Sequence, residues 1–133
     1  MNPRKLPMAN SGAGSVRHGY LSNAVRVEAG PLLFVSGQVA WDGAFDVVAR
    51  GDGAGQARQV FSNLKAVLAN YGADLSDVVR VTVYVTSLSW FDELAKIREE
   101  LFPGDGPAST IIEVSSLVDP ELLIEVDAVA AIN

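Results

Sequence analysis

Alternating side chains in residues 107–131 predict two β-strands joined by a turn. In the second run, one face carries apolar side chains only: Ile124, Val126, Ala128 and Ala130. The opposite face mixes apolar and acidic side chains: Leu123, Glu125, Asp127 and Val129. An acidic group inside an apolar strand is costly unless it meets water, a hydrogen-bond donor or a cation. We therefore expect this stretch to line a cleft or a wet sheet edge.

Three earlier parts of the chain also have strand character. Residues 23–28 and 32–37 predict a β-hairpin, with Ala29-Gly30-Pro31 as its turn. Asp42-Gly43 predicts a tight turn and a second, small hairpin. Residues 79–86 alternate most regularly, with four valines on one face, and predict a strand.

Two segments have the spacing of three or four residues that is typical of helices. One apolar stripe runs through residues 54–71, and Gly72 is placed to end that helix in the left-handed conformation. A second helix is predicted over residues 90–102. Ser89 and Asp92 resemble a capping box at its start.

This order of elements predicts an α+β fold, with a single mixed β-sheet and both helices packed on one face. The other face would need cover, and association between copies of the chain would supply it. Residues 1–18 are rich in Asn, Gly, Ser and Pro and predict a flexible N-terminal arm. Residues 19–133 are then expected to form a single domain.

Composition narrows the function classes. The chain has no Cys, which excludes disulfides, thiolate catalysis and thiolate metal sites. Its formal charge of −6 disfavours nucleic acid as a partner. No apolar run is long enough for a membrane span and no signal peptide is evident, so we expect a soluble, cytoplasmic protein with no membrane partner. The spacing of the aspartates near glycines fits no calcium loop, and we predict no metal and no cofactor.

Several short strings, taken in order, resemble the Rid family, also called the YjgF family. The similarity extends from about Tyr20 to Ile132. The strings are Asn23-Ala24-Val25, Val35-Ser36-Gly37-Gln38, Gln56, Asn63-Leu64, GADLSDVVRVTVYVTSL at residues 72–88, Pro107-Ala108, and Glu125-Val126-Asp127-Ala128.

The resemblance implies a YjgF-like, chorismate-mutase-like subunit, a homotrimer, and small-molecule clefts between neighbouring subunits. It also implies cofactor-free hydrolysis of reactive enamines or imines, such as 2-aminoacrylate, to 2-keto acids and ammonia. Glu125 matches the family's glutamate, which helps to place the imine and the attacking water. Ser36 and Gly37 match a backbone site for the substrate. Tyr20 and Leu21 compete for the place of an N-terminal aromatic residue.

One position departs from the family pattern. An arginine two residues after the Pro of the Pro-Ala pair holds the substrate carboxylate in the deaminases, and this chain has Ser109 there. A guanidinium binds a carboxylate bidentately, whereas serine offers one neutral hydrogen bond. We therefore expect a subgroup without the catalytic arginine and poor activity on 2-aminoacrylate. Arg17, Arg26 or a neighbouring subunit could still supply a cation.

Three functions stay open from the sequence. The first is a hydrolase for a small enamine or imine, with Glu125 positioning water and Ser36, Gly37 and Ser109 binding the substrate. The second is a non-catalytic trimer that binds a metabolite or a partner in its clefts. RNA cleavage is the least favoured, because of the acidic balance and the lack of an interior His. Without the resemblance, Glu125 and Asp127 would be interpreted as a solvated acidic stripe.

Overall fold

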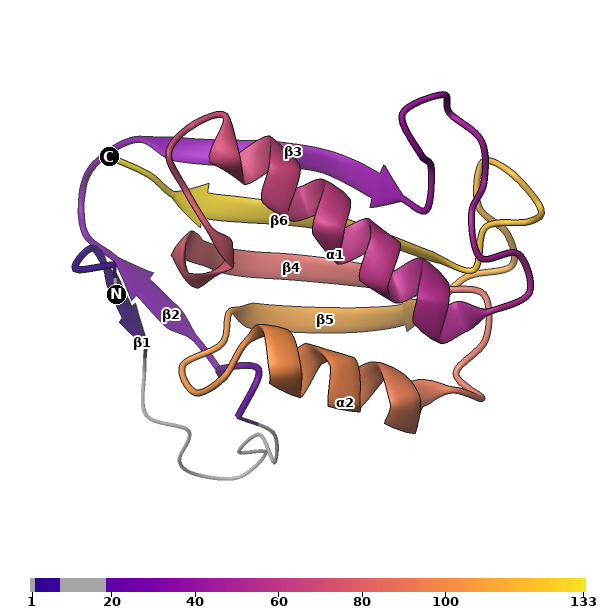
Figure 1. Ribbon diagram of the computed structural model, residues 1–133. Coiled ribbons are helices and arrows are strands. Elements are labelled where there is room, and N and C mark those ends of the chain that lie inside the picture. Colours follow the sequence, from indigo (N-terminus) through magenta and orange to yellow (C-terminus); the bar gives the residue numbers. More distant parts are fainter. Residues whose placement is uncertain (1, 8–18) are drawn as a thin grey trace.

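Four strands form one mixed sheet, and two helices cover one of its faces (Figure 1). This computed structural model describes residues 2–7 and 19–133. The strand order is β3-β6-β4-β5, with β4 and β5 parallel and the other neighbours antiparallel. The strands are β3 Leu32–Val39, β4 Val78–Val85, β5 Ala108–Glu113 and β6 Ile124–Ala131. The predicted α+β architecture is confirmed.

Two further strands, β1 Lys5–Pro7 and β2 Val25–Val27, form a separate antiparallel sheet. The predicted hairpin between residues 23–28 and 32–37 is therefore wrong, because β2 pairs with β1 and β3 pairs with β6. Arg4 binds the intervening turn instead, since its guanidinium donates to the carbonyls of Glu28 and Pro31. Residues 5–7 thus belong to a strand rather than to a flexible arm. Residues 8–18 of that predicted arm lie outside the described part of the chain.

The first helix, α1 Gly53–Ala69, buries most of the stripe predicted for it, whereas Tyr71, at the end of that stripe, lies beyond the helix and is exposed. Asp52 caps its start by accepting a hydrogen bond from the Gly55 N–H at 3.0 Å. Gly72, with φ 68°, follows its end in the left-handed conformation, as predicted. The short 3-10 helix η1, Leu75–Asp77, then leads into β4.

The second helix, α2 Phe91–Leu101, starts without the predicted capping box. Trp90 stands at the N-cap position and makes no side-chain capping bond. The Ser89 hydroxyl instead accepts a hydrogen bond from Ser87 Oγ at 2.8 Å. The buried face of α2 includes one charged side chain, Arg98, together with Leu94, Ala95 and Ile97.

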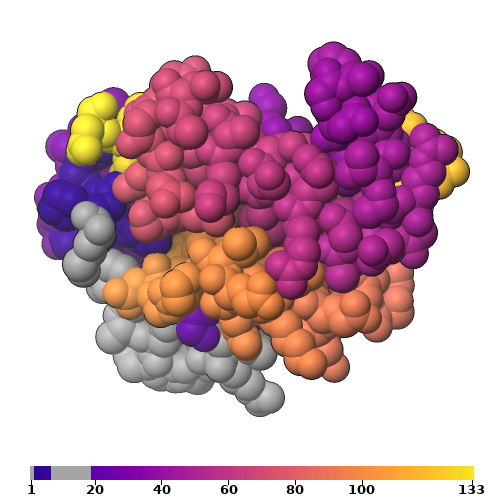
Figure 2. Space-filling model, in the orientation of Figure 1, coloured from indigo at the N-terminus to yellow at the C-terminus, as the bar shows by residue number. Residues whose placement is uncertain are grey.

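The two sheet faces differ in character. The predicted alternation of β6 is confirmed, because its apolar face lies buried beneath the helices. Figure 2 shows this helix side, where the side chains of α1 and α2 cover the sheet. The open face carries polar side chains of β4 and β6. It also carries exposed apolar side chains at its two edge strands, Phe34 (75% exposed) and Ile112 (41% exposed).

A buried glutamine ties α1 to the segment before β6, and its loss should be measurable. Gln56 is fully buried, donates to Glu121 O at 2.9 Å and accepts from Leu123 N at 2.8 Å. We expect Gln56→Leu to lower the free energy of unfolding by about 2 kcal/mol, since both backbone groups lose their partner. Urea unfolding would measure this. Gln59→Leu is the matched control, because Gln59 bonds only the Asn63 side chain among the contacts described. Equal, small losses for both variants would contradict the bridging role.

Candidate functional site

The five predicted site residues separate into two clusters at opposite edges of the sheet. Ser36 and Gly37 lie on β3, beside Glu125 of the neighbouring β6. Ser109 lies on β5, the other outer strand, and Tyr20 lies near it. We call the first group the β3-edge cluster (Ser36, Gly37, Glu125, Asp127 and Tyr84) and the second the β5-edge cluster (Tyr20, Arg98 and Ser109).

A β-bulge shapes the backbone of the β3-edge cluster. Val35 pairs with Ala128 and Gln38 pairs with Val126, so β3 uses one residue more than β6 over the same span. Ser36 and Gly37 lie inside this irregularity and have no ladder partner. The Ser36 carbonyl accepts a hydrogen bond from the Gln38 side chain at 3.0 Å. The bulge therefore leaves edge backbone that a ligand could contact.

The Glu125 carboxylate lies directly against this bulge. A Cβ placed on Gly37 would be 2.5 Å from Glu125 Oε2, so only glycine leaves room for the carboxylate there. Burial raises the pKa of Glu125, and the nearby Asp127 charge raises it further. A carboxyl group with a raised pKa, beside unpaired edge backbone, is suited to exchanging a proton with water.

Asp127 and Tyr84 continue the cluster along the open face. Tyr84 on β4 is paired in register with Glu125, and its hydroxyl donates to Asp127 Oδ2 at 3.0 Å. This hydrogen bond, together with burial, raises the pKa of Tyr84. Asp127 thus has a fixed donor, whereas Glu125 has no hydrogen-bond partner among the described contacts. The two carboxylates therefore occupy different environments, as an acid/base pair requires.

The β5-edge cluster is built around Arg98. Its Nη2 donates to Ser109 Oγ at 2.6 Å, and its guanidinium lies 4.6 Å from the centre of the Tyr20 ring. Arg98 is 2% exposed, and its Nε has no hydrogen-bond partner. No ion pair joins it to an acidic side chain among the residues described. A guanidinium thus adjoins the hydroxyl of Ser109.

Burial without a compensating anion makes this cation costly. It lowers the pKa of Arg98 to about 10, and the electrostatic effect of Tyr20 offsets this lowering only in part. Burial also raises the pKa of Tyr20, and the nearby Arg98 charge partly offsets this rise. Such a group would be stabilised by an anionic ligand.

Within one chain, the predicted substrate residues are not brought together. Ser109 is in register with Val81 and so faces the helices, whereas Glu125 and Asp127 lie on the open face. Arg26, one of the cations considered, forms an exposed ion pair with Glu28 at 3.5 Å. Arg17 lies outside the described residues.

Sequence reasoning missed Arg98. A signal was present, since Arg98 follows the buried Leu94 by one helical turn and so belongs to the apolar stripe of α2. Of the two residues that compete for the N-terminal aromatic position, Tyr20 is the one that contacts this cluster, and it is almost fully buried.

Other site types find no support in the described ranges 2–7 and 19–133. These residues hold no group of three His, Cys, Asp or Glu side chains arranged to bind a metal ion. They also contain no helix with the length and apolar character of a membrane span.

Comparison with known proteins agrees with this architecture. The family model described as endoribonuclease L-PSP matches residues 14–132. Protein DfrA of Myxococcus xanthus is 41% identical over 112 residues, which cover 84% of this chain and 85% of that protein. A RutC family protein of Pyrococcus horikoshii is 38% identical over 104 residues, covering 78% of this chain and 82% of its own.

Solved structures give the same result. A conserved Rid-family protein of unknown function from Yersinia pestis, YyfB, is 35% identical, with a TM-score of 0.86 and coverage of 97% of this chain and 99% of its own. A structure from Thermotoga maritima, titled as a putative endoribonuclease, is 31% identical with a TM-score of 0.72, covering 99% and 95% of the two chains. The chain therefore belongs to the Rid (YjgF) family, whose family model is described as endoribonuclease L-PSP.

Proposed function

We propose that this protein hydrolyses a small imine or enamine that carries a carboxylate, in a cleft between copies of the chain. The observation that supports this most is the Arg98 guanidinium, which is buried, lacks an anionic partner among the described residues and touches Ser109. It offers a charge-assisted anchor of the kind that Ser109 by itself does not provide.

The β3-edge cluster would supply the chemistry. A bound enamine first takes a proton from solvent at its β-carbon and becomes the iminium ion, which is also the protonated form of an imine substrate. Ionised Glu125 takes a proton from a water molecule as that water attacks the iminium carbon, and the C=N electron pair moves to nitrogen. The carbinolamine nitrogen then takes this proton from Glu125 and leaves as ammonia, while the hydroxyl group loses its proton to solvent and a carbonyl compound remains. The bulge at Ser36 and Gly37 would hold the substrate through backbone groups, a role that the resemblance to the Rid family implies.

The two clusters would meet across a subunit boundary. Ser36 and Gly37 lie on the outer strand β3 with Glu125 on its neighbour β6, whereas Ser109 lies on the other outer strand, β5, and faces the helices. We therefore infer that one small site around both clusters needs two copies of the chain. In a ring of copies, the β3 edge of one copy can face the β5 edge of the next. The exposed Phe34 and Ile112 on the open face support such an association. We propose a homotrimer, as the family resemblance implies.

The position of Arg98 changes the expected substrate. Poor activity on 2-aminoacrylate was predicted because position 109 lacks a cation, and Arg98 places one beside that hydroxyl. An enamine with a carboxylate therefore becomes the first substrate to test.

The test is a coupled assay for ammonia and 2-keto acid, with 2-aminoacrylate generated in place. We expect release above the uncatalysed rate, and slower release from an imine in which the carboxylate is replaced by an amide. Equal rates on acid and amide would contradict the anchoring role of Arg98. No turnover of either compound by an intact oligomer would favour the alternative, a non-catalytic binding module.

A further inference from the structure

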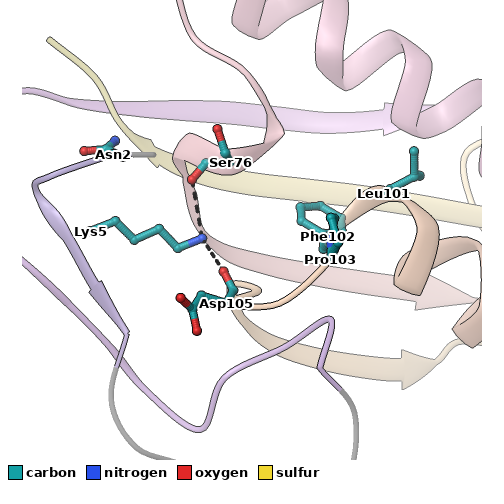
Figure 3. A pocket seen from close by; sticks show the side chains of 7 residues that line it. All are labelled: Asn2, Lys5, Ser76, Leu101, Phe102, Pro103 and Asp105. Carbon is teal, nitrogen blue, oxygen red and sulfur yellow. Dashed lines mark hydrogen bonds between the residues drawn. The ribbon is translucent and has the colours of Figure 1, made fainter.

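A cavity of about 240 Å³ lies between the N-terminal strand β1 and the segment that follows α2 (Figure 3). Its apolar wall is formed by Leu101, Phe102 and Pro103. Its polar side is formed by Lys5, Ser76 and Asp105, with Asn2 at one end. The cavity is small beside typical ligand pockets of about 300–1,000 Å³, so it suits a ligand of a few heavy atoms. None of its lining residues belongs to either cluster of the proposed site.

The Lys5 amine has a defined direction in this cavity. Its Nζ donates to Asp105 O at 2.9 Å and more weakly to Ser76 O at 3.5 Å, as the dashed lines in Figure 3 show. Both acceptors are backbone carbonyls, so two of the three substituent positions on the nitrogen are taken. The third position carries either a proton or, in the neutral amine, the lone pair.

The strand that carries Lys5 is held in place from both sides. β1 pairs with β2 in the register Lys5↔Val27. The Asn2 amide donates to Asp77 Oδ1 at 2.9 Å and to Ala131 O at 2.7 Å. Lys5 is therefore positioned by hydrogen bonds before any ligand arrives.

Lys5 also differs from the other two lysines of the chain. It is 7% exposed, whereas Lys65 and Lys96 are exposed. Burial lowers the pKa of Lys5, against the opposing effect of Asp105 and Asp77. A larger share of Lys5 is thus in the neutral, nucleophilic form at neutral pH.

The surroundings indicate the charge of the ligand. Asp105 lines the cavity, Asp77 lies near Lys5, and Lys5 is the only cationic side chain among the lining residues. A carboxylate in the ligand would face these acidic groups, whereas an apolar substituent would pack on Phe102 and Pro103. An uncharged aldehyde or ketone fits better than a 2-keto acid.

We propose that Lys5 forms a reversible imine with a small, uncharged aldehyde or ketone bound in this cavity. The Nζ lone pair bonds to the carbonyl carbon, and the C=O electron pair moves to oxygen. A proton then passes from nitrogen to oxygen, and the carbinolamine loses water to leave the imine. This goes beyond the proposed hydrolysis, because it uses a different cavity and a covalent lysine adduct.

The test traps the adduct on the full chain. The protein is incubated with butanal and sodium cyanoborohydride at pH 7, and each modified lysine is quantified by mass spectrometry with fragment ions that separate Lys5 from the α-amino group. We expect about tenfold or greater excess of adduct on Lys5 over Lys65 and Lys96, because a bound carbonyl meets the amine at a high effective concentration. Pyruvate is expected to give less adduct on Lys5 than butanal.

Two variants test whether the cavity itself causes the reaction at Lys5. Ser76→Leu adds bulk at the exposed wall of the cavity and should reduce the Lys5 adduct while circular dichroism stays unchanged. The double variant K65R/K96R should keep it. Equal labelling of all three lysines, or protection of Lys5 from butanal, would show that Lys5 only tethers β1 to the domain. Labelling does not depend on ammonia release, so this outcome is independent of the proposed hydrolysis.

Discussion

Replacing Glu125 with Gln is expected to lower kcat for imine hydrolysis about 10²–10⁴-fold, the usual range for loss of a general base. Glutamine keeps the size of the side chain that lies against Gly37 but cannot accept a proton from water. Single-turnover measurement of 2-keto acid formation would determine the effect. Glu93→Gln, an exposed change on α2, is the matched control and should leave the rate unchanged.

The pH dependence of the same rate tests the environment of Glu125. The base must be ionised, so the rate falls as the pH drops through the Glu125 pKa, which burial and Asp127 hold above the ordinary value. Asp127→Asn removes one of these causes, so the pH at which the rate falls to half on the acidic side should become lower. If that pH does not change in the variant, the two carboxylates are not coupled.

The free energy of unfolding of Glu125→Gln shows whether Glu125 has a functional or a structural role. Because its pKa is raised in the fold, the native state binds the proton more tightly than the unfolded state, and stability falls as the pH rises through that pKa. At neutral pH the ionised carboxylate is therefore unfavourable. We expect Glu125→Gln to keep or slightly raise stability while activity is lost.

The elements whose signal is local could be predicted from the sequence. The apolar stripe of α1 and the alternation in β4 and β6 fix which side chains face the core, and the structure confirms these faces. Gly72 ends its helix as predicted, because a left-handed residue has a strong local preference for glycine. Such patterns are independent of distant partners.

The pairing of the strands and the positions of the charged side chains depend on residues distant in the sequence, so they were harder to predict. The partner of β2 is β1, a three-residue strand without its own periodic pattern, so the sequence favoured the adjacent β3 instead. Ser109 and Glu125 belong to strands whose alternation was recognised. That Ser109 and Glu125 point to opposite faces of the sheet follows only from the parallel register between β4 and β5, which no local pattern shows. Arg98 was overlooked because a charged residue in an apolar stripe is usually placed at its border.

Arg98→Met should lower kcat/KM for a carboxylate-bearing imine about a hundredfold, which corresponds to loss of a charge-assisted contact of nearly 3 kcal/mol. The amide analogue should lose little, since it makes no such contact. Arg58→Met is the matched control: Arg58 forms an exposed ion pair with Glu100 at 3.0 Å, and removal of such a pair should change neither rate.

Arg98→Met is expected to leave the free energy of unfolding nearly unchanged, whereas a purely structural role of Arg98 would make it fall clearly. In the native state the pKa of Arg98 is lowered to about 10, well below its ordinary value, so the charged form costs about 3 kcal/mol at any pH below 10. Between these two values the unfolded state binds more protons, so stability rises with pH only in that alkaline window. Methionine removes the cost but also removes the stacking on Tyr20 and the bond to Ser109. We therefore expect a change within about 1 kcal/mol in urea unfolding at pH 7.

Binding of a non-reactive carboxylate compound shows most directly whether Arg98 binds an anion or only packs in the core. An anion that binds Arg98 stabilises the native state by mass action, so it should raise the Tm of the wild-type protein. The same anion should leave the Tm of Arg98→Met unchanged. If Arg98→Met instead unfolds readily and loses activity on acid and amide alike, Arg98 is a packing residue. The buried charge would then be held by Tyr20 and Ser109 alone, and the carboxylate anchor would have to come from another residue.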